Sequence, residues 1–302
     1  MKLVCTFLLI ILMHSNLAMA GDIKALEQHR WYAGEKNCEK GKKAAPIEIY
    51  HFDSDTYILR QNKCLHYEAP FLYLIFGSEQ ALLIDTGATE SVNTFPLFAT
   101  VNRIQRQRAK TLGLQKKALP LTVAHSHSHG DHIAGDGQFK GHNSVTVVPA
   151  KDLSGLQTTF GIKNWPKQQV KLDLGKRVLT LIPSPGHQSE AITFYDDKNK
   201  WLITGDNLYP GRLYIREWQV FKNSIRTLVE FSELHDVKAV LGAHIEMSLT
   251  AGVDYKMGST YHPDEASLVL YKEDLILLHR QLKILGDTPT KAVFDKFIIY
   301  PL

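Results

Sequence analysis

The segment from residue 124 to residue 132 constrains the fold of this chain more than any other, because it holds four of the chain's 14 histidines. It reads Ala-His-Ser-His-Ser-His-Gly-Asp-His and follows a short apolar run at residues 121–124 that is typical of a buried strand. Imidazole is the commonest metal ligand near neutral pH, and Asp131 adds a carboxylate oxygen. Loops at the carboxyl ends of strands are where α/β proteins place their sites. The segment therefore predicts a metal-binding loop.

The rest of the chain predicts an α/β domain, because strand patterns and helix patterns are interleaved. Apolar and β-branched runs predict strands at residues 47–52, 56–60, 71–76, 81–85, 121–124, 145–148, 178–182, 191–195, 201–204 and 239–241. Helical spacing of apolar residues predicts helices at 91–110, interrupted near Pro96, and at 221–235 and 264–285. We expect the last helix to cover one mouth of the site and residues 297–300 to add a final strand. No repeat or linker divides residues 21–302, so we expect one domain there.

The first twenty residues predict a secretory signal peptide. Lys2 precedes an apolar run at residues 3–13, and Ala18-Met19-Ala20 has the pattern of small residues at a cleavage site. That run is shorter than the roughly 20 residues needed to span a bilayer, which argues against a membrane anchor. We therefore expect cleavage after Ala20 and a periplasmic or secreted protein.

Two of the chain's 3 cysteines, Cys38 and Cys64, follow the predicted signal peptide. An even, minimal number of thiols in an exported chain favours a disulfide between them. Two free buried thiols are the alternative, because sequence alone cannot measure their separation.

Five motifs in order resemble those of the metallo-β-lactamase superfamily. The pattern His127-x-His129-x-Asp131-His132 is the family's signature, and His125 does not fit it in register. The other four segments each follow a predicted strand and are Leu83-Ile84-Asp85-Thr86-Gly87, Pro185-Gly186-His187, Thr204-Gly205-Asp206 and Leu241-Gly242-Ala243-His244. The resemblance covers residues 71–244 and implies the fold of that family, a four-layer αββα sandwich.

The resemblance also implies a centre for two metal ions, which are expected to be zinc, with iron or manganese as alternatives. The first ion would be held by His127, His129 and His187, and the second by Asp131, His132 and His244. Asp206 would bridge the two ions, and Asp85 would fix one of the ligands. Such a pair of ions shares a hydroxide that attacks the substrate, and Asp131 would orient this hydroxide and receive a proton.

Asp206 and Tyr209 indicate the branch of the family. A carboxylate at the position of Asp206 resembles the thioesterase (glyoxalase II) and lactonase branches, whereas members that degrade β-lactams typically lack it. Tyr209 stands where family lactonases carry a tyrosine that donates to the substrate carbonyl, and an aromatic packing residue is the alternative reading. The basic residues with which glyoxalase II binds glutathione have no clear match in this chain.

We therefore predict an exported dizinc hydrolase of esters, lactones or thioesters, with a small carbonyl compound as its partner. A β-lactamase of the same fold is the first alternative. A phosphodiesterase is disfavoured because the formal net charge is only +4 and no basic or aromatic stripe predicts binding of nucleic acid. A mononuclear iron enzyme similar to persulfide dioxygenases and a metal-binding module without catalysis complete the alternatives. We expect no membrane insertion after signal cleavage.

Overall fold

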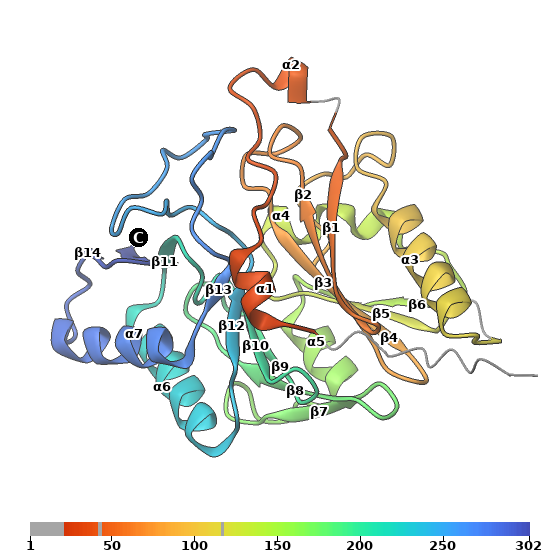
Figure 1. Cartoon of the computed structure of the whole chain (residues 1–302). Coiled ribbons are helices and arrows are strands. Elements are labelled where there is room, and N and C mark those ends of the chain that lie inside the picture. Colours follow the sequence, from red (N-terminus) through yellow and green to blue (C-terminus); the bar gives the residue numbers. More distant parts are fainter. Residues whose placement is uncertain (1–20, 42–43, 116–117) are drawn as a thin grey trace, which may run out of the picture.

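The computed structural model describes residues 21–41, 44–115 and 118–302, so the predicted signal peptide lies outside the described residues. Two six-stranded sheets lie face to face at the centre of the molecule (Figure 1). Helix α3 (Leu97–Thr111) covers the outer face of the first sheet, and α6 (Trp218–Leu234) and α7 (Lys272–Leu285) cover the outer face of the second. The predicted αββα sandwich is confirmed.

The first sheet has the order β1-β2-β3-β4-β5-β6. Neighbouring strands are antiparallel from β1 to β4, and β4, β5 and β6 are parallel. Its strands are β1 (Ile47–Asp53), β2 (Thr56–Gln61), β3 (Phe71–Phe76), β4 (Ala81–Ile84), β5 (Leu121–Ala124) and β6 (Val145–Val147). Because parallel strands end at the same edge, the residues after β4 and β5 meet there.

The second sheet has the order β13-β12-β10-β9-β8-β7, with β10 and β12 parallel. Its strands are β7 (Val170–Asp173), β8 (Val178–Pro183), β9 (Ile192–Asp196), β10 (Trp201–Gly205), β12 (Ala239–Gly242) and β13 (Val269–Leu270). A small third sheet joins β11 (Arg212–Ile215), β15 (Ile298–Pro301) and β14 (Ala292–Val293). The shorter helices are α1 (Ile23–Gln28), α2 (Cys38–Gly41), α4 (Gly130–Ile133), α5 (Leu153–Phe160) and the 3₁₀ helix η1 (Ala134–Gln138).

Three apolar layers hold the sandwich together, because successive side chains of a strand point to opposite faces of its sheet. In β2, Ile58 packs between the two sheets and Leu59 packs toward α3. The layer between the sheets includes Ile58, Tyr73, Ile75, Ile84, Leu181, Phe194, Ile203 and Leu241. The layer under α6 and α7 includes Leu202, Val240, Phe221, Ile225, Leu228, Leu275, Leu278 and Leu282. Burial on both faces explains why these strands read as continuous apolar runs.

The helix predicted at 264–285 is correct only from Lys272 onward. Tyr271 is extended, and its backbone N–H donates to the Asp274 carboxylate at 2.8 Å, which begins the helix at the next residue. Upstream of it, Val269 packs between the sheets while the next residue, Leu270, packs under α7, as expected of a strand. The expectation that this helix covers the mouth of the site is wrong, since α7 packs on α6 (Figure 1). The predicted final strand is confirmed as β15.

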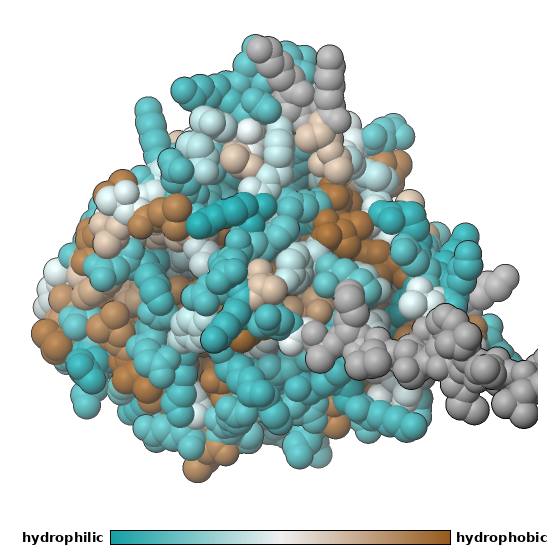
Figure 2. Space-filling view, in the orientation of Figure 1, coloured by the Kyte–Doolittle hydropathy of each residue, from teal (hydrophilic) through white to brown (hydrophobic). Residues whose placement is uncertain are grey.

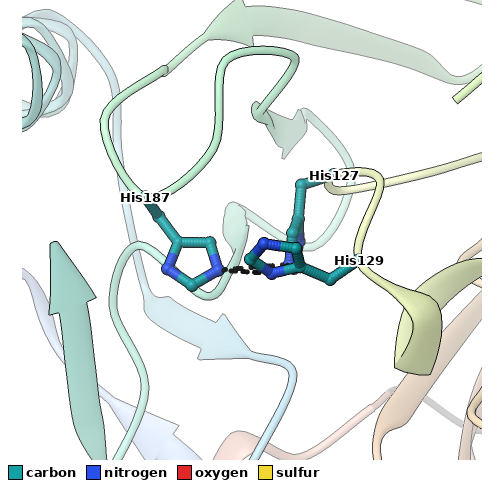
Figure 3. Close-up of side chains that lie close together, drawn as sticks. All are labelled: His127, His129 and His187. Carbon is teal, nitrogen blue, oxygen red and sulfur yellow. Dashed lines mark hydrogen bonds between the residues drawn. The ribbon is translucent and has the colours of Figure 1, made fainter. Parts of the chain in front are cut away.

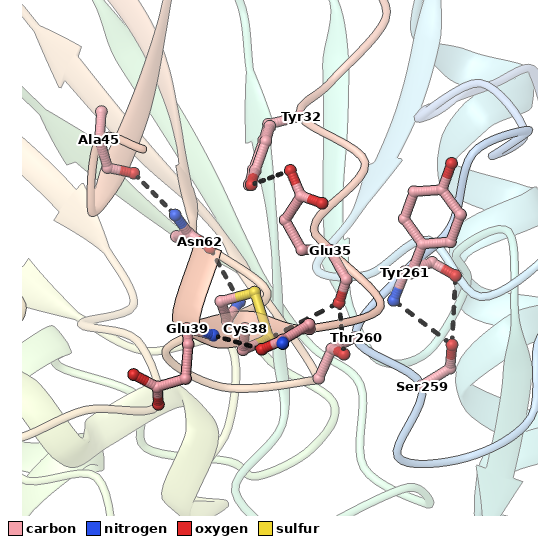
Figure 4. Close-up of a disulfide and its surroundings, with 11 residues drawn as sticks. Tyr32, Glu35, Cys38, Glu39, Ala45, Asn62, Ser259, Thr260 and Tyr261 are labelled. Atoms are coloured by element: carbon pink, nitrogen blue, oxygen red, sulfur yellow. Dashed lines mark hydrogen bonds between the residues drawn. A yellow bond between two sulfur atoms is a disulfide. The ribbon is translucent and has the colours of Figure 1, made fainter. Parts of the chain in front are cut away.

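Cys38 and Cys64 form the predicted disulfide, with 5.0 Å between their Cα atoms (Figure 4). Next to it, the backbone N–H of Glu35 donates to the carbonyl of Thr260 at 3.0 Å, and the Thr260 hydroxyl donates back to the carbonyl of Glu35 at 2.9 Å. The disulfide and these bonds attach the N-terminal segment both to the end of β2 and to the loop around Thr260. A covalent link of this kind favours the folded state by restricting the unfolded chain.

Arg177 joins the two sheets through a buried polar network. Its Nε donates to Asp196 Oδ1 at 2.9 Å, and its Nη2 also contacts the same carboxylate. The guanidinium further donates to the carbonyl of Asp55 at 3.0 Å and to the Thr56 hydroxyl at 3.0 Å, both in the first sheet or its hairpin turn. The side chains of Arg177 and Asp196 are 2% and 0% exposed, so this pair lies in the interior.

A second buried charge cluster lies beside the disulfide. Glu265 accepts two bonds from Arg60, at 2.6 and 2.7 Å, and lies 3.1 Å from the ammonium of Lys63. It also bonds His262 Nδ1 at 2.9 Å. Two buried cations thus share one carboxylate. Burial lowers the pKa of Lys63 from 10.5 to about 8, although Glu265 partly offsets this effect.

Replacing Lys63 by methionine is expected to stabilise the protein at pH 7. The lowered pKa means that the folded state holds the Lys63 proton less tightly than the unfolded chain does, at a cost of about 3 kcal/mol below pH 8. This cost disappears as the pH rises from about 8 to 10.5, so the advantage of Lys63→Met should shrink over that range. Urea unfolding at pH 7 and pH 10 measures it, with the exposed Lys171→Met as control. A destabilised Lys63→Met variant at pH 7 would contradict this expectation.

The surface carries no apolar belt on the face shown in Figure 2, where apolar residues are interspersed among hydrophilic ones. Within the described residues, no helix has both the length and the apolar character needed to cross a membrane.

Candidate metal centre

The histidine-rich loop lies at the end of β5, where the carboxyl ends of strands from both sheets come together. Ile84 is paired with Ala124 in the first sheet, and Gly205 is paired with Gly242 in the second, so the residues that follow these strands meet at one edge. The first sheet supplies the loop from His127 to His132, which runs into α4. The second sheet supplies His187 after β8, Asp206 after β10 and His244 after β12. All seven residues predicted to bind metal lie in two groups at this junction.

The first group is formed by three histidines whose ring nitrogens converge (Figure 3). His127 Nε2 lies 3.0 Å from His129 Nδ1, and His187 Nε2 lies 3.2 and 3.0 Å from these two atoms. The other nitrogen of His187 donates to the carbonyl of Tyr214 at 2.7 Å, which leaves a lone pair on the converging Nε2. Three inward-facing imidazole nitrogens match the donor set of a zinc-like ion.

The second group consists of Asp131, His132, Asp206 and His244, whose ligand atoms all lie within 4.8 Å of one another. Asp131 Oδ2 lies 3.0 Å from His132 Nε2 and 3.2 Å from His244 Nε2. His244 Nδ1 donates to the carbonyl of Glu68 at 3.1 Å, so its Nε2 also faces inward with a lone pair when the ring is neutral. The group combines nitrogen and oxygen donors, as zinc, iron and manganese sites do.

Asp206 lies between the two groups. Its Oδ1 is 3.5 Å from His132 Nε2 and 3.3 Å from His244 Nε2, whereas its Oδ2 is 3.8 Å from His127 Nε2 and 3.5 Å from His187 Nε2. The residue is 8% exposed, and Oδ1 has no hydrogen-bond partner despite its burial. A buried carboxylate oxygen without a partner is costly unless a cation binds it. Asp206 therefore lies between the two donor groups, with one carboxylate oxygen facing each of them.

Asp85 and Ser126 fix the orientation of two of the histidines. Asp85 Oδ2 bonds His132 Nδ1 at 2.8 Å and accepts from the Ser126 hydroxyl at 2.8 Å. The same hydroxyl lies 3.1 Å from His127 Nδ1. Asp85 adopts a left-handed backbone with φ 67, a strained conformation that its bonds to Ser126 and His132 hold in place. A hydrogen-bonded carboxylate behind a ligating histidine fixes its tautomer and raises its basicity.

Two glycines give the neighbouring loops the shape that the site needs. Gly186 has φ +131, and a Cβ there would lie 2.4 Å from the Cα of Phe221 in α6. Gly205 has φ +53, and a Cβ there would lie 2.5 Å from the Cβ of Ser126. Any other residue at either position would push His187 or Asp206 out of place.

His125 and the histidines outside the motifs lie away from both groups. His125 Nε2 bonds Asp136 Oδ1 at 2.8 Å instead. Among the described residues, the two groups contain none of the outlying histidines, which are His29, His51, His66, His142, His235, His262 and His279.

The electrostatics of the two groups differ. Burial, reinforced by His187, lowers the pKa of His129 to about 4, and burial also lowers the pKa of His127 and His187. These three rings are therefore neutral at pH 7. In the second group, burial opposes protonation of His132 and His244, but the adjacent Asp131 and Asp206 carboxylates raise the pKa of both. The centre thus presents neutral rings on one side and ionised carboxylates on the other, which favours divalent cations.

A cavity of about 140 Å³ opens onto the centre. Besides five of the metal-binding candidates, its wall contains Glu68, Tyr209, Tyr214, Arg216, Glu246 and Leu302. Of these, the sequence predicted only Tyr209. The other five lie in or near β3, β11, β12 and β15, outside the motifs. The one sequence signal for them is the spacing of two between Tyr214 and Arg216, which puts both side chains on the same side of an extended segment.

Tyr209 is placed differently from the expected substrate donor. Its side chain is 1% exposed, and its hydroxyl donates to the carbonyl of Arg212. Its ring centroid lies 5.5 Å from that of His244 in an edge-to-face contact. This arrangement favours the packing role, which the sequence left open as the alternative.

Paired sheets with two groups of metal donors at their shared edge define a metal-dependent hydrolase of the αββα class. The sequence profile of the metallo-beta-lactamase superfamily matches residues 69–244, and the chain belongs to this superfamily. It is 25% identical over 227 residues to the human acyl-coenzyme A thioesterase MBLAC2, a match that covers 63% of this chain and 77% of the thioesterase. It is 29% identical over 160 residues to a hydroxyacylglutathione hydrolase of Legionella pneumophila strain Corby, covering 51% and 58% of the two chains.

The fold has solved counterparts. The metallo-beta-lactamase FIM-1 from Pseudomonas aeruginosa superimposes with a TM-score of 0.53 over 82% of this chain and 99% of its own, at 11% identity. At this identity the likeness concerns the fold alone.

Proposed function

We propose that this chain is an exported dizinc hydrolase that cleaves the carbonyl of an ester, a lactone or a thioester. The position of Asp206 carries the proposal, because one of its oxygens faces each group of donors. The residues present fit two ions. His127, His129 and His187 would hold the first, Asp131, His132 and His244 the second, and Asp206 would bridge them. When bound, two such ions supply a hydroxide nucleophile at neutral pH and a Lewis acid for the carbonyl.

The protein's own groups orient the reaction. Asp131 lines the cavity and lies within hydrogen-bonding distance of His132 and His244, so it can orient the attacking water and accept a proton from it. Asp85 and Ser126 prevent rotation of the His127 and His132 rings. No serine or cysteine nucleophile is needed for this chemistry.

Thioesters are the substrates favoured by the relatives, since one is a thioesterase and hydroxyacylglutathione is itself a thioester. The bridging carboxylate argues against the β-lactamase alternative, although a solved structure of that name shares the fold. Two separate donor groups also argue against a mononuclear iron site. Export is supported by the signal-like residues 1–20 and by the Cys38–Cys64 disulfide, which fits an oxidising compartment.

The experiment that tests this proposal compares three substrates with the zinc-loaded protein purified without residues 1–20. A thioester, an acyl lactone and a chromogenic cephalosporin are assayed under the same conditions. We expect turnover of the thioester or the lactone and none of the cephalosporin. Turnover of the cephalosporin alone, or bound iron with oxygen consumption on a persulfide, would overturn the proposal in favour of the respective alternative.

A further inference from the structure

Arg216 is the notable group on the cavity wall beyond the metal donors. Its guanidinium is exposed and has no hydrogen bond or ion pair with any residue that the structure describes. The two charged side chains on the wall other than Arg216 and the metal-binding candidates, Glu68 and Glu246, already have partners. Glu246 accepts from Arg212 Nη2 at 2.6 Å and from the Arg212 backbone at 2.7 Å. Glu68 accepts from the Tyr67 hydroxyl at 3.0 Å. Arg216 is thus the cation left available to a ligand.

The backbone holds Arg216 next to the first donor group. Its N–H donates to the carbonyl of Gly186 at 3.1 Å, immediately before His187 in the chain. Two residues earlier, the carbonyl of Tyr214 accepts from His187 Nδ1 at 2.7 Å. Tyr214 lies in β11 and Arg216 directly follows that strand, and both line the cavity.

The Tyr214 hydroxyl is oriented as a donor. It accepts from Arg212 Nε at 2.9 Å, so its own proton points elsewhere, and no described residue accepts that proton. A phenol keeps its proton at neutral pH. A phenol O–H and a guanidinium on the same cavity wall, one within β11 and the other at the residue after it, form a donor pair for an oxyanion.

We infer that Tyr214 and Arg216 form an anion-binding subsite that selects carbonyl substrates bearing a second, negatively charged group, a carboxylate or a phosphate. The anion lies on this face while the scissile carbonyl lies over the metal centre. This inference rests on the proposed function for the identity of the reacting carbonyl, but the subsite itself can bind an anion whether or not turnover follows. Arg216 and Tyr214 act here as determinants of specificity.

Uncleavable ligands test the subsite separately from catalysis. N-butanoylglycine, N-butanoylaminomethylphosphonate and the neutral N-butanoylglycine methylamide are titrated calorimetrically into the zinc-loaded protein. We expect at least one anion to bind more tightly than the neutral amide, and Arg216→Ala to weaken its binding about 10- to 100-fold without affecting the amide. Tyr214→Phe should weaken it about 5-fold, and Arg216→Lys should restore part of the loss. Which anion binds more tightly identifies the group that the subsite prefers.

The matched control is Arg226→Ala, which removes an arginine whose side chain is 57% exposed on α6, outside the cavity wall. A steady-state assay complements the titration. For an anionic and a neutral thioester of equal length, Arg216→Ala should raise KM for the anionic one alone and leave kcat unchanged. Equal binding of all three ligands, or equal losses for anion and amide, would overturn the subsite. Anion binding that depends on Arg216, without turnover of either thioester or of the acyl lactone, would retain the subsite and reject the proposed function.

Discussion

Replacing Asp206 by alanine is expected to abolish hydrolysis, with a loss on the order of 10³-fold or more. Its carboxylate has one oxygen toward each donor group, so its removal would take a ligand from both proposed metal positions. Bound zinc should fall from two ions per chain to one or none. Turnover and metal content by elemental analysis are measured on the same sample, because the prediction couples them.

The control for Asp206→Ala is Asp287→Ala, which removes a carboxylate that is 89% exposed. This variant should retain two zinc ions and full activity. Circular dichroism should show the same fold for both variants, since alanine at residue 206 removes a buried charge and leaves the strands unchanged. Full activity of Asp206→Ala, or two tightly held zinc ions in it, would contradict the assignment of this residue as the bridge.

Replacing Arg177 by methionine is expected to lower the free energy of unfolding by about 3–5 kcal/mol. The change leaves the Asp196 carboxylate buried without a cation and also removes the bonds to Asp55 and Thr56 in the other sheet. Urea denaturation at pH 7 measures the loss. The exposed Arg226→Met should change stability by no more than about 0.5 kcal/mol, because its partner Glu230 lies at the surface.

A double variant separates the ion pair from the packing around it. Arg177→Met combined with Asp196→Leu removes both charges, and it should recover much of the stability that the single change loses. If Arg177→Met alone lowers the free energy of unfolding by less than about 1 kcal/mol, the network contributes little to holding the two sheets together.

The sequence could indicate which candidate metal donors lie together, because each of their motifs comes after a strand with a strong apolar pattern. His187, Asp206 and His244 could be aligned with family motifs, and strand ends meet at one edge once the sheet order is known. The apolar runs also predicted most strands of the two large sheets, since burial on both faces leaves little ambiguity.

Other features depend on contacts between distant residues, which local patterns do not contain. The run from Leu268 to Leu270 has helical spacing with the residues that follow it, but pairing with β12 makes it a strand. Tyr209 could be placed near the centre, yet the direction of its hydroxyl depends on the turn at Arg212. Arg216 carries no motif at all, and only its place on the cavity wall distinguishes it from a surface arginine.

The division of the donors between the two sheets affects more than catalysis. His127 and His129 belong to one half of the sandwich and His187 to the other, and the second group is divided in the same way. An ion bound at either position would therefore act as a crosslink between the two halves, in addition to the apolar packing, the Arg177 network and hydrogen bonds such as that from the Tyr73 hydroxyl to the carbonyl of Gly242. By mass action, ligand binding to the folded state raises its stability with the logarithm of free ligand concentration. The melting temperature of this protein should then rise with the concentration of free metal in its surroundings. Removal of the metal would lower the stability of the contact between the two halves as well as the activity.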